Sequence, residues 1–258
     1  MNATLLQSAT LTLLLTACGL AATDPFVGKW KFNLAKSQTA GQWVKVEELG
    51  SNKYRFDDGA APQTLIADGT DQPLEFGGTM SLQKTGETTW KTVSKRDGRI
   101  LSEATWTMAP DGKLLTVHAT GTRLDGSKFD NEDVMARTIG TTGLAGTWES
   151  KSEKRSSLTV WEIQPYENGL SFVYPASKGR LDIKFDGKEY VEQGPAAPKG
   201  ITVSAKRQGA NTLQLVDKHD GKALDTSEWS VSADGKVLTM TIHNTGQKKA
   251  EVLVYERQ

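Results

Sequence analysis

The feature that most constrains this chain is an internal duplication. The segment "WTMAPDGKLLTVHATG" (residues 106–121) returns as "WSVSADGKVLTMTIHNTG" (residues 229–246), and "FVGKWKFN" (residues 26–33) is matched by "LAGTWESK" (residues 144–151). Six of the seven tryptophans fall into three such pairs, namely Trp30 with Trp148, Trp43 with Trp161, and Trp106 with Trp229. Because self-similarity at long spacing indicates a structural unit that occurs more than once, each half of the chain must form the same fold.

The repeats divide the chain into two predicted domains. We place the first copy at residues 25–138 and the second at residues 143–258, joined by the Gly/Thr segment "TIGTTGL" at residues 138–144. With 258 residues, 37% of them apolar, each copy is long enough to bury a core of its own.

Both copies have the pattern of β-structure. Short alternating runs rich in Thr, Val, Trp and Tyr are separated by Asp-Gly pairs, which suit tight hairpins because the turn requires positive φ angles. These pairs begin at Asp68, Asp97, Asp111, Asp125, Asp186, Asp220 and Asp234. The sequence therefore predicts an all-β protein of two tandem antiparallel barrels in meander order, with about eight or nine strands each; a sandwich is the alternative.

The N-terminus has the pattern of an export signal. Residues 1–22 contain a short apolar stretch that is well below the length of a membrane-spanning helix. It ends in "LTACG", which resembles a bacterial lipobox and predicts cleavage before Cys18 and lipidation of that cysteine. Ordinary cleavage at residues 19–21 and an uncleaved segment are the alternatives. We expect an exported protein of the cell envelope, periplasmic or lipid-anchored at the outer membrane, or a secreted one.

Two classes of partner are disfavoured by composition. The 31 basic side chains balance 31 acidic ones, so the positive field that nucleic-acid binding needs is missing. We expect no nucleic-acid partner, and contact with a membrane only through the lipid anchor. Because Cys18 is the only cysteine, no intramolecular disulfide can stabilise either copy.

The two ends of each copy resemble a known group. Each copy opens with Gly-x-Trp (residues 28–30 and 146–148), and each ends in a strand that carries an arginine, Arg137 or Arg257. This resembles the lipocalin and calycin barrels, and in particular the lipocalin-like repeats of secreted bacterial proteins. The resemblance implies that Trp30 and Trp148 close one end of each barrel, with Arg137 and Arg257 as their cation–π partners.

The repeated histidines are the clearest candidates for functional side chains, but they are too few to form a metal site. His118 and His243 both occur as His-x-Thr-Gly, on the strand face opposite the apolar residues. They point either outward to water or into a polar cavity. Zinc needs three or four ligands, and no nucleophile, phosphate-loop or metalloprotease motif is present. We therefore predict no metal, no cofactor and no catalytic residue.

The predicted function is sequestration of a small apolar or amphipathic ligand inside a barrel. The candidate ligand-binding residues are Trp43, Trp106, Trp161, Trp229, His118 and His243. The main alternative is a protein-interaction or structural module of the envelope whose barrels are filled by side chains. An enzyme such as an isomerase or cyclase is a third, less favoured possibility. An interior cavity larger than about 300 Å³ would favour the first interpretation.

Overall fold

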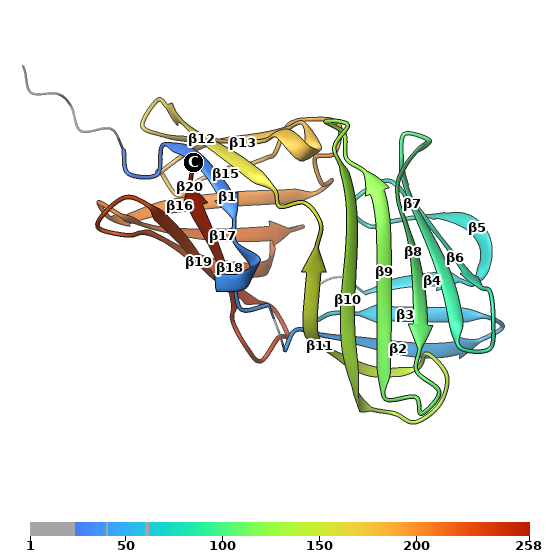
Figure 1. The fold of residues 1–258 in the computed structure, drawn as a ribbon. Coiled ribbons are helices and arrows are strands. Elements are labelled where there is room, and N and C mark those ends of the chain that lie inside the picture. The colour runs from blue at the N-terminus through green and yellow to red at the C-terminus, as the bar shows by residue number, and fades with distance from the viewer. Residues whose placement is uncertain (1–23, 40, 60–61) are drawn as a thin grey trace, which may run out of the picture.

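The chain folds into two nearly closed antiparallel β-barrels of ten strands each, one or two strands more than the sequence indicated (Figure 1). A computed structural model describes residues 24–39, 41–59 and 62–258. The predicted signal segment and Cys18 lie outside the described residues. Within the described ranges, no helix has the length and apolar character needed to cross a membrane.

We call the two sheets the first and the second barrel. The first barrel consists of β2 (Trp43–Gly50), β3 (Lys53–Asp57), β4 (Gln63–Ile66), β5 (Asp68–Pro73), β6 (Thr79–Lys84), β7 (Thr89–Arg96), β8 (Arg99–Met108), β9 (Leu114–Thr122), β10 (Lys128–Ile139) and β11 (Gly146–Arg155). The second consists of β1 (Gly28–Phe32), β12 (Val160–Tyr166), β13 (Gly169–Tyr174), β14 (Gly179–Lys184), β15 (Glu189–Tyr190), β16 (Ile201–Gly209), β17 (Thr212–His219), β18 (Lys222–Val231), β19 (Val237–Asn244) and β20 (Glu251–Arg257). Two 3-10 turns, η1 (Leu34–Lys36) and η2 (Pro175–Ser177), lie in connections.

The opening strands of the two repeats are exchanged between the barrels. β1 pairs with β12 and β20, so that Trp30 lies opposite Trp161 on one side and Arg257 on the other. β11 pairs with β2 and β10 in the same way. In Figure 1 the blue β1 accordingly runs beside the red β20, far from the blue-to-green strands that follow it in the sequence. Each barrel is therefore completed by the first strand of the other repeat.

The exchange separates the boundaries of the barrels from those of the repeats. Residues 140–145, which overlap the predicted linker of residues 138–144, connect β10 to β11 within the first barrel. The first barrel is continuous in sequence from β2 to β11. β1 precedes this unit in the sequence, yet it pairs within the second barrel, whose other strands all follow the unit. A short loop between successive strands favours a hairpin, so β11 pairs with β10 in the first barrel. The position that β11 would otherwise take in the second barrel, between β12 and β20, is taken by β1.

Each barrel is closed by a few hydrogen bonds where the two edge strands of its sheet meet, β4 and β5 in the first barrel and β14 and the segment after β15 in the second. In the first barrel, the Gln72 side-chain amide donates to the Ile66 carbonyl at 2.8 Å and accepts from the Ile66 N–H at 2.7 Å, as a neighbouring strand would. In the second, the backbones of Arg180 and Gln193 exchange two bonds of 2.9 and 2.7 Å. Closure of this kind limits the exposed edges through which β-proteins aggregate.

Two of the seven Asp-Gly pairs form the tight hairpin that the sequence predicted. Asp97 and Gly98 have φ of 49° and 76°, and Asp220 and Gly221 have φ of 48° and 77°. Two consecutive positive φ angles define a turn whose twist matches the flanking strands. These hairpins connect β7 to β8 and β17 to β18, at equivalent places in the two repeats.

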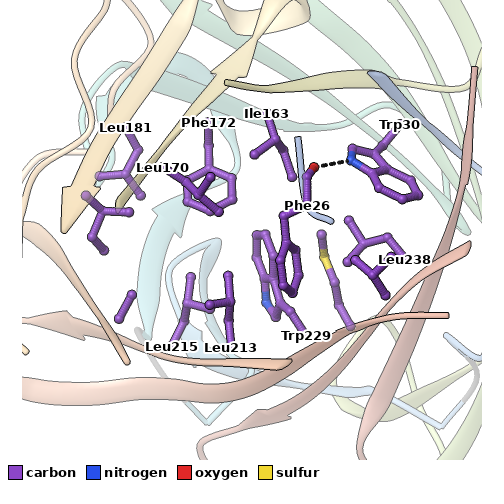
Figure 2. Close-up of a cluster of buried hydrophobic side chains, with 14 of the residues drawn as sticks. Phe26, Trp30, Ile163, Leu170, Phe172, Leu181, Leu213, Leu215, Trp229 and Leu238 are labelled. Carbon is purple, nitrogen blue, oxygen red and sulfur yellow. Dashed lines mark hydrogen bonds between the residues drawn. The ribbon is translucent and has the colours of Figure 1, made fainter. Parts of the chain in front are cut away.

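Each barrel has its own apolar core. In the second barrel, Trp30, Phe172, Leu213 and Leu238 are essentially inaccessible to solvent, and Figure 2 shows them facing one another across the interior. The indole N–H of Trp30 donates to the carbonyl of Phe26 at 2.8 Å, so its one polar group is satisfied inside the core.

Candidate functional site

A tryptophan and an arginine close one end of each barrel, and the exchange of strands decides which arginine meets which tryptophan. The guanidinium carbon of Arg257 lies 4.2 Å from the ring centre of Trp30, and that of Arg137 lies 4.1 Å from the ring centre of Trp148. Each pair therefore combines the two repeats: the arginine of the second copy covers the tryptophan of the first, and the reverse. Both contacts have the geometry of a cation–π interaction.

The glycine of each Gly-x-Trp motif makes room for that arginine. Gly28 has φ of 149° and Gly146 of 147°, and a Cβ atom at either position would collide with the guanidinium of Arg257 or Arg137. The guanidinium of Arg257 donates to the carbonyls of Pro25, Val27 and Gly235. The tryptophan and the arginine thus form a plug at the end of the barrel, and backbone carbonyls accept hydrogen bonds from its guanidinium. This is a structural role.

The second barrel contains an interior cavity of about 250 Å³. Its lining residues come from most strands of the barrel and from the β15–β16 loop: Trp161, Tyr174, Leu181, Glu192, Pro198, Ile201, Val203, Leu215, Asp217, Asp225, Ser227, Trp229, Met240, Ile242, Asn244 and Leu253. The predicted residues Trp161 and Trp229 are brought together here. Their ring centres are 5.9 Å apart.

Trp161 is the centre of an aromatic wall in this cavity. Its ring packs edge-on against Tyr174, with 5.0 Å between centres, and lies 5.0 Å from the ring of Tyr255. The indole N–H of Trp229 donates to the hydroxyl of Ser227 at 3.0 Å. Because this bond holds the Trp229 ring in place, the wall offers two fixed indole surfaces to an occupant of the cavity.

Two carboxylates face each other in the lining of the same cavity. Asp217 on β17 lies directly across from Asp225 on β18, and both line the cavity. Within the described part of the chain, neither side chain has a hydrogen bond or an ion pair. Burial raises the pKa of Asp217 to about 7, with further contributions from the charges of Asp225 and Glu192. Burial also raises the pKa of Asp225.

Two further acidic groups lie near this pair. Burial raises the pKa of Glu192, and the charge of Arg96 in the first barrel partly offsets the effect. Burial also raises the pKa of Glu251, which is near Asp225 and has a hydrogen bond from Asn244. Among the described residues that line the cavity, none is lysine, arginine or histidine. The lining of the cavity therefore combines aromatic and apolar side chains with acidic ones.

The raised pKa of Asp217 predicts a pH dependence of stability. An aspartate in the unfolded chain loses its proton near pH 4, whereas folded Asp217 keeps it up to about pH 7. The folded state therefore binds more protons between these values, and its stability falls as pH rises, by up to about 1.4 kcal/mol per pH unit. We expect Asp217→Asn to reduce this slope, as measured by urea unfolding at pH 4.5, 6 and 8. The raised pKa values of Asp225, Glu192 and Glu251 preserve the rest of it.

A control for this prediction is Asp234→Asn in an exposed turn. There a hydrogen bond from Ser232 lowers the pKa, so the aspartate stabilises the fold when ionised. This variant should keep the decline between pH 4.5 and 7. An unchanged pH profile in Asp217→Asn would contradict the assignment.

Residues of the first barrel contact the β15–β16 loop, which lies at the mouth of the cavity. Arg96, at the end of β7, donates to the carbonyls of Pro195 at 3.2 Å and Ala197 at 2.5 Å in the β15–β16 loop. The neighbouring Pro198 lines the cavity. His219, at the position equivalent to Arg96 in the second repeat, packs edge-on against Phe76 of the first barrel at 5.0 Å. These contacts fix the loop at the end of the barrel opposite the Trp30–Arg257 plug.

The interior of the first barrel is packed with side chains around Trp106, whereas a more open pocket of about 390 Å³ lies at one end, where Ser94 and Ser102 line it. Trp106 packs edge-on against Phe56, with 6.0 Å between ring centres, and its indole N–H donates to Thr92 at 3.1 Å. Met80, Met108 and Met135 pack against the same core. Where the second barrel has Asp217 opposite Asp225, the first has Ser94 opposite Ser102. Trp106 is therefore placed in a core, away from the cavity that contains Trp161 and Trp229.

Three of the predicted ligand-binding residues lie outside the barrels. His118 is exposed on the outer face of β9, 2.7 Å from Asp130, and His243 is exposed on β19. Trp43 points away from the interior of the first barrel and donates to the carbonyl of Gly246 at 3.2 Å. The reason is a shift of one residue: Val44, not Trp43, lies opposite Trp148, as Trp161 lies opposite Trp30. Since neighbouring residues of a strand point to opposite faces, the shift turns Trp43 outward.

The acidic residues of the cavity were missed in the sequence because their strands also carry exposed charges. A signal did exist in the alignment of the two repeats, where Asp217 and Asp225 take the places of Ser94 and Ser102. In the described residues, no group of three or more His, Cys, Asp and Glu side chains is arranged to hold a metal ion.

Comparison with known proteins gives no further identification, since no known family model and no curated protein matches the chain.

Proposed function

We propose that the protein is an exported, lipocalin-like binding protein that holds one small amphipathic molecule inside its second barrel. The observation that carries this proposal is the cavity of about 250 Å³, whose lining combines the rings of Trp161 and Trp229 with a few polar groups. Binding sites for small molecules are typically enclosed, mostly apolar and equipped with a few polar groups that fix orientation.

The volume of the cavity limits the size of the ligand. It is slightly below the range of about 300–1,000 Å³ typical for drug-sized ligands. A cavity of about 150 Å³ accommodates benzene, so 250 Å³ suits a single ring with a short side chain.

The two barrels have different roles in this proposal. The packed first barrel holds the β15–β16 loop through Arg96 and so shapes the mouth of the second barrel. The Trp30–Arg257 plug closes the other end. A ligand would enter past the loop, near Pro198. The segment that ends in "LTACG" would export the chain, and lipidation of Cys18 would keep it at the envelope.

The test is a substitution that fills the cavity. Val203 on β16 lines the cavity, and Val203→Phe places a ring in it. We expect a native mass spectrum of the wild-type protein, purified from its own host, to contain a bound small molecule that Val203→Phe lacks. Since the ring enters existing space, the variant should unfold near the wild-type denaturant concentration. In a filled interior the same change would cost about 1–3 kcal/mol.

The matched control is Met80→Phe in the first barrel. Met80 lies opposite Ser94 just as Val203 lies opposite Asp217, so the two positions are equivalent. This variant should retain the bound molecule. A ligand that persists in Val203→Phe would show that this cavity is not the site.

A second candidate function is a structural or protein-interaction module of the cell envelope. The core of the first barrel favours it, because side chains around Trp106 fill the space there without a ligand. A wild-type spectrum free of small molecules, together with strong destabilisation of Val203→Phe, would select this alternative.

A further inference from the structure

We propose that the ligand of the second barrel is an organic cation, an amine whose ammonium group lies between Asp217 and Asp225 and whose apolar body packs against Trp161 and Trp229. This inference rests on the proposed function and specifies its ligand class. Four features of the cavity support it.

The first feature is the direct juxtaposition of two carboxylates. Asp217 and Asp225 lie directly opposite each other on antiparallel strands, an arrangement that is destabilising for like charges. The first barrel has the same local backbone, with a register shift just after Ser94 as there is after Asp217. Serine therefore satisfies this backbone, and the fold itself does not require carboxylates here.

The second feature is the missing counter-charge. The described residues that line the cavity include three acids, Glu192, Asp217 and Asp225, and none is lysine, arginine or histidine. A buried carboxylate without a partner is costly. A bound cation would supply the partner, whereas a neutral apolar ligand would leave the pair uncompensated and an anion would be repelled.

The third feature is a polar group without a partner beside the pair. Tyr174 is partly buried, and its side chain borders the cavity near Glu192 and Asp217. Within the described residues its hydroxyl has no hydrogen bond. An ammonium-bearing ligand with a second polar atom would satisfy this hydroxyl as well as the carboxylates.

The fourth feature is the aromatic wall in the same cavity. The ring centre of Trp161 lies 5.0 Å from that of Tyr174 and 5.9 Å from that of Trp229. Indole faces attract cations as well as apolar groups. Because the wall is broad and no three-ligand group is formed by the described residues, the site suits an organic cation better than a bare metal ion.

Binding should depend on pH in the direction set by the acids. The titratable groups around the pair are Glu192, Glu251, Tyr174 and Tyr255, with Arg96 as the charge from the first barrel. A pKa of about 7 for Asp217 means that the pair loses its last proton near neutral pH. An amine should therefore bind more tightly at pH 8 than at pH 5.5.

The experiment compares three compounds that share one ring and differ in charge: 4-fluorobenzylamine, 4-fluorobenzyl alcohol and 4-fluorobenzoate. Their binding to the full chain is measured by fluorine NMR at pH 8 and physiological salt, which screens exposed charges beyond about 8 Å. We expect the amine to bind at least about tenfold more tightly than the alcohol, as a charge-assisted contact implies, and the benzoate not to bind.

The decisive variant carries Asp217→Ser and Asp225→Ser, which install the pair of the first barrel. In it the amine should bind no better than the alcohol, while the affinity for the alcohol is retained, which shows that the cavity is intact. Equal binding of amine and alcohol by the wild type, or amine preference that survives in the double variant, would overturn the inference and leave the proposed function standing. If Val203→Phe binds all compounds like the wild type, or the wild type binds none, the proposed function itself fails.

Discussion

Trp30→Ala should destabilise the protein by about 3–5 kcal/mol, and the loss should appear in the second barrel. A buried tryptophan replaced by alanine leaves a large cavity, which accounts for the magnitude. Trp30 is inaccessible to solvent, and its ring is covered by Arg257. Urea unfolding measures the free energy. Hydrogen exchange locates the damage, which we expect in β12 and β20, more than a hundred residues away in sequence.

The control for this prediction is Trp148→Ala, which should act on the other barrel. Trp148 is equally buried and lies opposite Arg137 and Val44. Its loss should expose the amides of β2 and β10 and spare β12 and β20. If Trp30→Ala instead exposed β2 and β10, each repeat would keep its own opening strand and the exchange would be wrong.

The exchange of strands could not be predicted from the repeats because the two opening strands are nearly equivalent. Both begin with Gly-x-Trp, and both repeats end in a strand that carries an arginine. The choice is made by connection length. The six residues from Gly140 to Ala145 form the turn between β10 and β11, whereas the sequence alone presents them as a flexible linker between domains.

What the sequence did predict depended on local rules. Alternating apolar residues and Asp-Gly pairs indicated an all-β fold of two antiparallel barrels, and the structure has that fold. The same rules place Leu115 on the face of β9 that points into the barrel and His118 on the face that points to solvent. Strand alternation fixes the face of a residue once the register is known.

The site was harder to predict because it depends on register and on differences between the repeats. Matching tryptophans suggested that Trp43 and Trp161 are equivalent, yet a shift of one residue puts them on opposite faces. The conserved pattern of the duplication describes what the two barrels share. The acidic character of the cavity comes from a position where they differ, the pair formed by Asp217 and Asp225, and no rule of local structure singles out those positions.

A disulfide between β1 and β20 should form readily and raise the stability of the fold. Lys31 lies directly opposite Glu256 across these antiparallel strands, where α-carbon distances allow a disulfide. We expect Lys31→Cys with Glu256→Cys, in a Cys18→Ser background, to oxidise in the native protein. The bond closes a loop of more than two hundred residues, which stabilises the fold by about 5 kcal/mol on the loop-entropy model. Loss of the surface ion pair of Glu256 with Lys36 costs little.

The control pair for the disulfide tests the alternative arrangement. If β1 belonged to the barrel of its own repeat, Lys31 would lie opposite Ala136, because Ala136 faces Glu149, the counterpart of Lys31. Lys31→Cys with Ala136→Cys should therefore remain reduced in the folded protein. Non-reducing electrophoresis distinguishes the outcomes, since a bond within one chain speeds its migration and a bond between two chains doubles its mass. Ready oxidation of the control pair, or dimers from the first pair, would mean that the strands are not exchanged within one molecule.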